Sequence, residues 1–409
     1  MGKSNIYYGW YVVVAGFFIT FTLGEAMWSF GVFFKPLASD FGWSRAVVSS
    51  GYTAFLIGFG ISSIVFGRLA DIYSPRPILL VSALLAGTGI ALCSRVETIN
   101  ELRFFLFVGG LGGGATWSVP TSAVQKWFYQ RERAGLALGI VISGIGIGAM
   151  VFTPLINWFI ATWGWRHSYL IVGAFYFLII AAAALVMKKS PEASKEETDD
   201  PISTQQYEWT AGTVLLNPSF IAIMSVNCLV VIAFQTVTVH IVPYATDRGV
   251  SMTVAAAALG LMGGFSFFGR ILSGFIADIM RWQWTLVVAC TGLGIFILFL
   301  MFVETPWMLY CFVAFFGLFL GIRSPAHVGV IGEFFGMRSL GELIGITSAA
   351  AMLASALAPA LAGFIFDTTG SYLWAFIIVM VLLLVGGLIA ARMEKPTIPH
   401  RPCQGGLSS

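Results

Sequence analysis

Charged residues are scarce in this sequence: Asp, Glu, Lys and Arg make up 10 % of the 409 residues, whereas 58 % are hydrophobic. Soluble domains carry roughly a quarter charged residues, so a water-soluble protein of this length could not cover its surface with polar groups. The net charge of +3 is too small to suggest a nucleic-acid partner. The composition therefore predicts a protein that resides in a membrane and contacts its lipids.

The sequence also lacks the signatures of enzymatic and metal chemistry. It contains no phosphate-binding loop and no nucleophile–base constellation. The five cysteines form no CxxC pair and no cluster with histidine; they are Cys93, Cys228, Cys290, Cys311 and Cys403. We therefore expect no enzymatic activity, no cofactor and no metal. A membrane sensor is disfavoured as well, because the longest polar stretch, residues 188–210, has the composition of a linker.

Long apolar runs are abundant instead. A membrane-spanning helix needs about 20 apolar residues, and the chain offers twelve such runs. Their expected limits are 8–35, 45–66, 77–94, 103–124, 134–157, 166–187, 219–243, 253–275, 283–303, 307–332, 342–366 and 371–391. The first run is longer than the ~7–15 apolar residues of a signal peptide, so we expect a retained helix. The pattern predicts an all-α membrane protein.

Short motifs recur in the second half of the chain at a constant offset of 207 positions. Pro36, Ala38, Asp40, Gly42 and Ser44 recur as Pro243, Ala245, Asp247, Gly249 and Ser251, and Gly67, Ala70 and Asp71 recur as Gly274, Ala277 and Asp278. The repeat predicts two parallel six-helix bundles, residues 1–187 and 219–409. The segment 188–218 would join them as a cytoplasmic linker.

The Lys and Arg residues between the spans set the expected orientation. They are enriched on the side that holds both termini and the linker, with Arg68, Lys126, Lys188 and Arg392 among them. Because cytoplasmic loops carry an excess of Lys and Arg, both termini are expected in the cytoplasm. We expect a multi-pass protein of a plasma membrane, here a bacterial inner membrane, that works as a monomer.

One loop motif reads Gly67-Arg68-Leu69-Ala70-Asp71 followed by Arg76, with a weaker copy from Gly274 to Asp278. This motif resembles the loop signature of the major facilitator superfamily. The physical expectation is a tight turn whose Asp accepts hydrogen bonds from a helix N-terminus and pairs with basic residues. In this architecture two parallel halves enclose a substrate site near the bilayer midplane.

Further motifs lie along both halves: Tyr8-Gly9-Trp10, the run Ser29 to Lys35, Trp127-Phe128, Arg131 to Gly139, Ser143-Gly144, Pro154, and the pattern of Arg270, Gly274, Ala277 and Asp278. Together these motifs resemble the monocarboxylate transporter family, in the bacterial branch that includes oxalate:formate exchangers. The resemblance implies that Arg270 binds the substrate carboxylate. Two positions that are ionisable in the family and linked to proton coupling are occupied here by Trp28 and Ser266. No lysine lies between Gly341 and Phe366, where oxalate exchangers carry a second cation.

The few charges inside the spans point to a site independently of the resemblance. A charge at bilayer depth costs about 2.5–3.5 kcal/mol and should face a cavity or a partner. Arg270 has Ser63 as its repeat counterpart, so the fold does not require the charge. Its guanidinium suits bidentate carboxylate binding; the alternative is a structural ion pair. Arg323, just before Pro325, is either a second anion contact or a structural partner of Glu25.

Other intramembrane residues leave two interpretations open. Glu25 is either a protonatable coupling site or a counter-ion. His240 is either a substrate contact and proton carrier or a ring hydrogen-bonded within the bundle, and His327 carries the same two interpretations. Trp28 and Trp117 would wall the site, or simply pack between helices.

The expected function is transport of small monocarboxylates, such as lactate or pyruvate, by proton symport with alternating access. The alternative is an organic anion exchanger or dicarboxylate carrier, favoured if Arg270 and Arg323 share one ligand.

Overall fold

The structure is a computed structural model, and it describes residues 7–28, 30–43, 45–129, 131–190, 211–355 and 358–396. Regular structure within these ranges is helical, which confirms the predicted all-α class. The first half contains α1 (Gly9–Trp28), α2 (Phe30–Phe41), α3 (Arg45–Ile72), α4 (Pro75–Leu92), η1 (Cys93–Arg95), α5 (Ile99–Gly113), α6 (Ala115–Trp127) and α7 (Ala134–Val186). The second contains α9 (Ala211–Val214), α10 (Pro218–Asp247), α11 (Met252–Leu300), α12 (Pro306–Phe335), α13 (Leu340–Ser355), α14 (Ala358–Thr369) and α15 (Leu373–Ala391).

Each of the twelve expected spans falls largely on helix. In the described part of the chain, seven helical stretches are long and apolar enough to cross a membrane, and α7 and α11 each supply two expected spans. Non-helical backbone divides these two helices, at Gly164 (φ 78°) and at Arg281 (φ 71°). Glycine tolerates a positive φ at little cost. For Arg281 a positive φ is costly. The Arg281 side chain forms an ion pair with Glu333, in which Arg281 Nη2 lies 2.5 Å from Glu333 Oε1.

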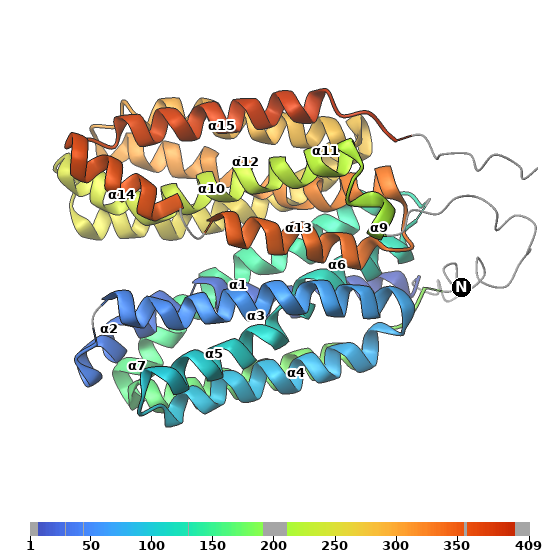
Figure 1. Cartoon of the computed structure of the whole chain (residues 1–409), viewed down its shortest axis with the longest axis horizontal. Helices are drawn as coiled ribbons and strands as arrows, with labels where there is room; N and C mark the ends of the chain where they lie inside the picture. Colours follow the sequence, from blue (N-terminus) through green and yellow to red (C-terminus); the bar gives the residue numbers. More distant parts are fainter. Residues whose placement is uncertain are drawn as a thin grey trace, which may run out of the picture.

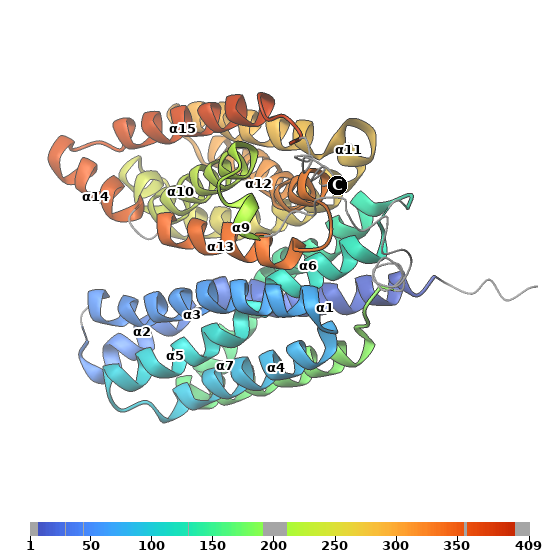
Figure 2. The ribbon, with the colours of Figure 1, turned by 45° about the vertical axis from the view of Figure 1, so that its right-hand side comes forward.

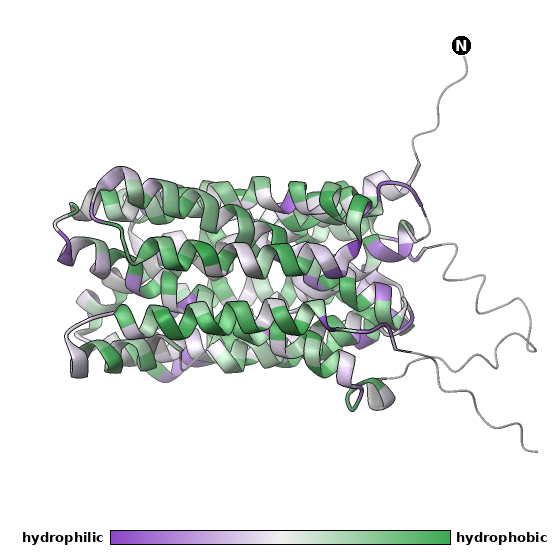
Figure 3. Cartoon of the chain, turned by 90° about the horizontal axis from the view of Figure 1, so that it is seen from above, coloured by the Kyte–Doolittle hydropathy of each residue, from purple (hydrophilic) through white to green (hydrophobic). Residues whose placement is uncertain are grey.

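The helices form two groups that lie side by side along the long axis of the molecule (Figures 1 and 2). Each group encloses its own hydrophobic cluster, one built from α1 to α7 and the other mainly from α9 to α15. Apolar residues cover the flanks of the helices, and polar residues gather toward the ends (Figure 3). This distribution suits a bundle whose sides face lipid. The expected boundaries of the halves and linker remain predictions, because 191–210 lies outside the described residues.

The two halves touch closely at the end of the bundle that carries α9, on the right of Figure 1, which we call the linker end. There α3 approaches the start of α13. Gly67 and Gly341 lie so close that neither position has space for a Cβ. The Asp71 carboxylate accepts hydrogen bonds from the backbone N–H groups of Gly341 and Glu342, both at 3.0 Å, and lies 2.6 Å from Lys126 Nζ. Asp71 therefore caps a helix of the other half.

The repeat produces a second contact of the same kind between α11 and α7. Gly274 and Gly135 face each other without space for a Cβ, and Asp278 Oδ1 accepts a hydrogen bond from the N–H of Gly135 at 3.1 Å. A carboxylate at a helix N-terminus is stabilised by the free N–H groups and the helix dipole. We call these two contacts the paired latch: Gly67, Asp71, Gly341, Gly135, Gly274 and Asp278.

Arg76, the last residue of the loop motif, is exposed, and the described residues offer it no ion pair within 4.0 Å. The other arginine of the motif, Arg68, lies 3.8 Å from Glu342, but the Arg68 side chain is 67 % exposed. An ion pair so exposed contributes little. The cation that matters for Asp71 is therefore Lys126, at the end of α6.

The paired latch supports a prediction about the equilibrium between the states that are closed and open at the linker end. Gly135→Ala would place a methyl group against the Gly274 carbonyl and the Asp278 carboxylate. Overpacking costs about 1–3 kcal/mol, which corresponds to a roughly 5- to 150-fold shift toward a state open at the linker end. Gly260→Ala is the matched control, because a Cβ there meets open space. Spin labels at Arg76 and Arg338 should show a longer distance in Gly135→Ala only; unchanged distances would contradict the latch.

Candidate functional site

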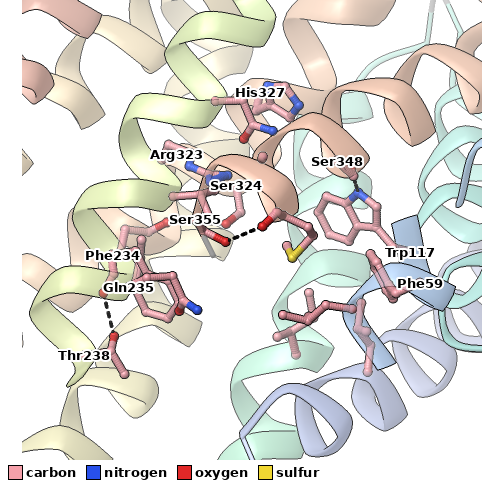
Figure 4. Close-up of a pocket in the computed structure, with 18 of the residues that line it drawn as sticks. Phe59, Trp117, Phe234, Gln235, Thr238, Arg323, Ser324, His327, Ser348 and Ser355 are labelled. Carbon is pink, nitrogen blue, oxygen red and sulfur yellow. Dashed lines mark hydrogen bonds between the residues drawn. The ribbon is translucent and has the colours of Figure 1, made fainter. Parts of the chain in front are cut away.

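A cavity of about 300 Å³ lies between the two halves, near the middle of the helices. Its walls come from α1, α3, α6 and α7 of the first half and from α10, α11, α12 and α13 of the second. Figure 4 shows Phe234, Gln235 and Thr238 on one side, with Phe59 and Trp117 on the other. The paired latch lies beyond the cavity on the linker end. The cavity is thus bounded by both halves, as a site used in alternating access must be.

Arg270 on α11 contributes the first cation. It is 6 % exposed and lines the cavity. Its Nη1 donates a hydrogen bond to Ser266 Oγ at 2.7 Å, one turn earlier on the same helix, while its Nε has no hydrogen-bond partner in the described residues. No carboxylate of those residues lies within 4.0 Å of the guanidinium. Asp278, two turns further on, caps α7 instead.

Arg323 on α12 contributes the second cation to the same cavity. It is 8 % exposed, and its Nε is also buried without a hydrogen-bond partner in the described part of the chain. Pro325 lies inside α12 two residues later and has no N–H to complete the helical ladder. None of the described carboxylates pairs with either arginine, so the described part of the cavity wall carries two guanidiniums without a carboxylate partner.

A polar cluster beside Arg323 was not predicted as a unit. His327 Nε2 lies 3.1 Å from Thr347 Oγ1, and Asn227 Nδ2 donates to the Thr347 carbonyl at 3.0 Å. Asn227 Oδ1 and His327 Nδ1 are both buried without a hydrogen-bond partner in the described residues. Both residues line the cavity. Among the described residues, the site therefore has two incompletely paired cations and two polar atoms without a hydrogen-bond partner.

Trp117 joins the two halves at the cavity wall. Its indole N–H, from α6, donates a hydrogen bond to Ser348 Oγ on α13 at 2.9 Å (Figure 4). Ser348 in turn donates to the Ile344 carbonyl at 2.7 Å. Trp117 thus supplies apolar surface to the cavity and a polar bond between the halves, and that bond must break if α6 and α13 separate.

The other predicted site residues lie elsewhere or are not described. The side chains of Glu25 and Trp28 lie outside the described residues, so a pair of Glu25 with Arg323 stays a prediction. His240 is not among the residues that line the cavity; its Nδ1 lies 3.2 Å from the Tyr372 hydroxyl. The rotation of α10 turns His240 toward α15 and turns Asn227, Gln235 and Thr238 toward the cavity.

The residues that sequence reasoning missed are uncharged. On α10, Asn227, Val231, Phe234, Gln235 and Thr238 recur at helical spacing along the cavity wall, and on α13 so do Ser348, Ala351, Met352 and Ser355. Polar residues at such spacing in apolar spans carry the signal that would have found them. The signal is weak, since serine and threonine also occur in ordinary helix packing within membranes.

The chain is similar in sequence to known transporters over most of its length. Over 402 residues the chain is 26 % identical to monocarboxylate transporter 13 of Rattus norvegicus, covering 96 % of this chain and 89 % of that protein. It is 25 % identical to monocarboxylate transporter 2 of the same species, covering 93 % and 83 %. Both are distant relatives, and the bacterial oxalate:formate branch is not distinguished by them.

Solved structures show the same fold. A double tryptophan mutant of XylE superposes with a TM-score of 0.77 at 13 % identity, covering 96 % of this chain and 97 % of the other. FucP in the outward conformation superposes with a TM-score of 0.71 at 16 % identity, covering 94 % and 99 %. Residues 16–313 and 283–406 match the Major Facilitator Superfamily. The chain is therefore a multi-pass membrane protein that belongs to the major facilitator superfamily of secondary transporters, and it is not an enzyme.

Proposed function

We propose that this transporter carries a small monocarboxylate, of the size of lactate or pyruvate, and that Arg270 binds the carboxylate. The observation that carries the proposal is the buried Arg270 guanidinium, which lines the cavity without a carboxylate partner among the described residues. A charge at this depth needs compensation, and a substrate carboxylate supplies it through two parallel N–H···O bonds. Distant relatives named monocarboxylate transporters support the same class of substrate.

The arrangement of the two halves supports alternating access. The paired latch holds α3 against α13 and α7 against α11 at the linker end. The cavity lies on the opposite side of these contacts, and Tyr52 and Thr238 line it toward the other end of the bundle. If the linker end is cytoplasmic, as the Lys and Arg pattern predicts, this state receives substrate from outside. Breaking the latch and the Trp117–Ser348 bond would then release it inside.

Proton symport is the proposed mode of coupling. A carboxylate that enters alone moves negative charge against the usual membrane potential, at about 2.3 kcal/mol per 100 mV. Entry with one proton removes this cost. Glu25 is the first candidate for the proton site, and His240 is the second. His240 would act at a distance from the cavity, through its contact with Tyr372.

A second candidate function is favoured by one observation. Arg323 lines the same cavity as Arg270 and likewise has no carboxylate partner in the described residues. A dicarboxylate could place one carboxylate on each guanidinium. Exchange of one anion for another would keep both cations compensated during each crossing. The protein would then be an organic anion exchanger or dicarboxylate carrier.

Uptake by the full chain in proteoliposomes distinguishes these functions. With labelled lactate, an inward proton gradient should raise the initial rate, and Glu25→Gln should remove most of that increase while leaving lactate-for-lactate exchange largely intact. Glu304→Gln is the matched control, because Glu304 is exposed in the turn between α11 and α12. Uptake that ignores the gradient and requires an internal anion would support the exchanger instead. A gradient effect that neither Glu25→Gln nor His240→Gln reduces would exclude both as the proton site.

A further inference from the structure

Four side chains that line the cavity each carry one buried polar atom without a hydrogen-bond partner in the described residues. Two are donors, the Nε atoms of Arg270 and Arg323. The other two are Asn227 Oδ1 and His327 Nδ1. All four side chains are at least nine-tenths buried, and all line the same cavity. The proposed substrate carboxylate would pair with these donors, so the remaining question is what satisfies the other two atoms.

Thr347 determines the hydrogen-bonding role of His327. The Thr347 hydroxyl lies 3.1 Å from the carbonyls of Leu343 and of Ile344, and it donates its single hydrogen to them. With the hydrogen assigned in this way, the Thr347 hydroxyl accepts from His327 Nε2 in their 3.1 Å bond. In a neutral imidazole the other nitrogen is then an acceptor. His327 Nδ1 is thus a buried acceptor.

The same residue determines the role of Asn227. The Thr347 carbonyl only accepts, so the Asn227 amide must turn its NH₂ group toward it, as the 3.0 Å bond shows. Asn227 Oδ1 is the atom left over, and it is a second buried acceptor. Asn227 and His327 are therefore both held by Thr347 and both present an acceptor. A buried polar group without a partner costs about 1–3 kcal/mol, so each needs a donor.

The chemistry of the donor is restricted by its neighbours. A carboxylate cannot donate, and neither can a keto oxygen or a hydrocarbon chain. An ammonium group can donate, but it would bring a third positive charge into the cavity that holds Arg270 and Arg323. A protonated His327 is opposed for the same reason, because Arg323 lies one turn earlier on α12. An uncharged hydroxyl group fits these restrictions; a bound water would fit them as well, and comparing acids with and without a hydroxyl separates the two.

We propose that Asn227 and His327 accept a hydrogen bond from a hydroxyl group of the substrate, so that the site selects hydroxy acids over the corresponding unsubstituted and keto acids. This inference rests on the proposed function, since Arg270 must hold the carboxylate. A site built to bind a substrate hydroxyl rejects analogues that lack it, because its own polar atoms are then left unpaired. We expect a preference of at least about tenfold.

Calorimetric titration of the purified full chain tests the inference with two matched pairs of acids. Lactate should bind at least about tenfold more tightly than propanoate, or malate more tightly than succinate, according to whether the site takes one carboxylate or two. Pyruvate, which has an acceptor in place of the hydroxyl, should bind no better than propanoate. Equal affinities within both pairs would overturn the inference while leaving carboxylate binding intact. If no acid of either pair binds, the proposed function itself fails.

Two variants assign the preference to these residues. His327→Gln keeps an amide N–H near the position of Nε2 for Thr347 but removes the Nδ1 acceptor, and Asn227→Leu removes the Oδ1 acceptor. Each should bring the affinity for the hydroxy acid to within about threefold of the affinity for the unsubstituted acid, both measured on the same variant. Thermal unfolding of each variant checks that it is folded. The comparison of acids on the wild-type protein tests the inference without either variant. A full preference retained in both variants would overturn the assignment.

Discussion

Replacing Arg270 by lysine should reduce the affinity for a carboxylate substrate by about 30-fold or more, although the positive charge is retained. Loss of a buried, hydrogen-bonded charge pair costs about 2–5 kcal/mol, and 2 kcal/mol corresponds to about 30-fold. Arg270 uses Nη1 for Ser266 and keeps Nε and Nη2 for a ligand. A lysine has one nitrogen, which cannot hold Ser266 and both carboxylate oxygens in one plane. Uptake of labelled lactate and its concentration dependence measure the effect.

The same substitution at Arg248 is the matched control. Arg248 follows α10 in the same half, and its Nη1 donates to the carbonyls of Met301 and Val303 at 3.2 and 2.9 Å. Its guanidinium lies 4.5 Å from the centre of the Tyr244 ring. It is not part of the cavity wall, so Arg248→Lys should transport normally if it folds. Near wild-type lactate affinity in Arg270→Lys would refute the role of Arg270.

The sequence alone predicted the scaffold well, because the scaffold depends on signals that are local or repeated. The apolar runs predicted where the helices lie. The turns at Gly164 and Arg281 fall in the gaps between the expected spans. The loop motif predicted an Asp that accepts hydrogen bonds from a helix N-terminus, and in the structure Asp71 and its repeat counterpart Asp278 each do so across the two halves. Scarcity of charge alone singled out Arg270 and Arg323.

The cavity wall was harder to predict because it depends on helix rotation. His240 and His327 carried the same two interpretations in the sequence, since both are histidines in apolar helices. In the structure His327 lines the cavity, and His240 contacts Tyr372. Nothing local distinguishes them: the difference arises from how α10 and α12 turn against α13 and α15. The hydrogen bonds of Thr347 to two other helices are likewise a property of packing.

Arg323 offers the second large effect, because its role depends on the number of carboxylates in the substrate. Arg323→Gln removes the second guanidinium but keeps a polar side chain of moderate length. If each arginine holds one carboxylate, succinate should lose about 30-fold or more in affinity. Propanoate, held by Arg270, should lose less than about tenfold, because only the longer-range attraction of Arg323 is missing. Titration of both acids against the same preparation measures the difference.

A control variant and a stability measurement make the Arg323 prediction independent of transport. Arg323→Lys keeps the charge, so it should preserve propanoate binding and weaken succinate less than Arg323→Gln does. Arg323 is 8 % exposed and has no carboxylate partner among the described residues. A buried charge without a partner destabilises the fold, so ligand-free Arg323→Gln should unfold at a higher temperature than wild type, and Arg323→Lys should not. A lower unfolding temperature of Arg323→Gln would indicate that Arg323 pairs with Glu25 instead. Equal losses for both acids would show that the two arginines hold a single carboxylate together.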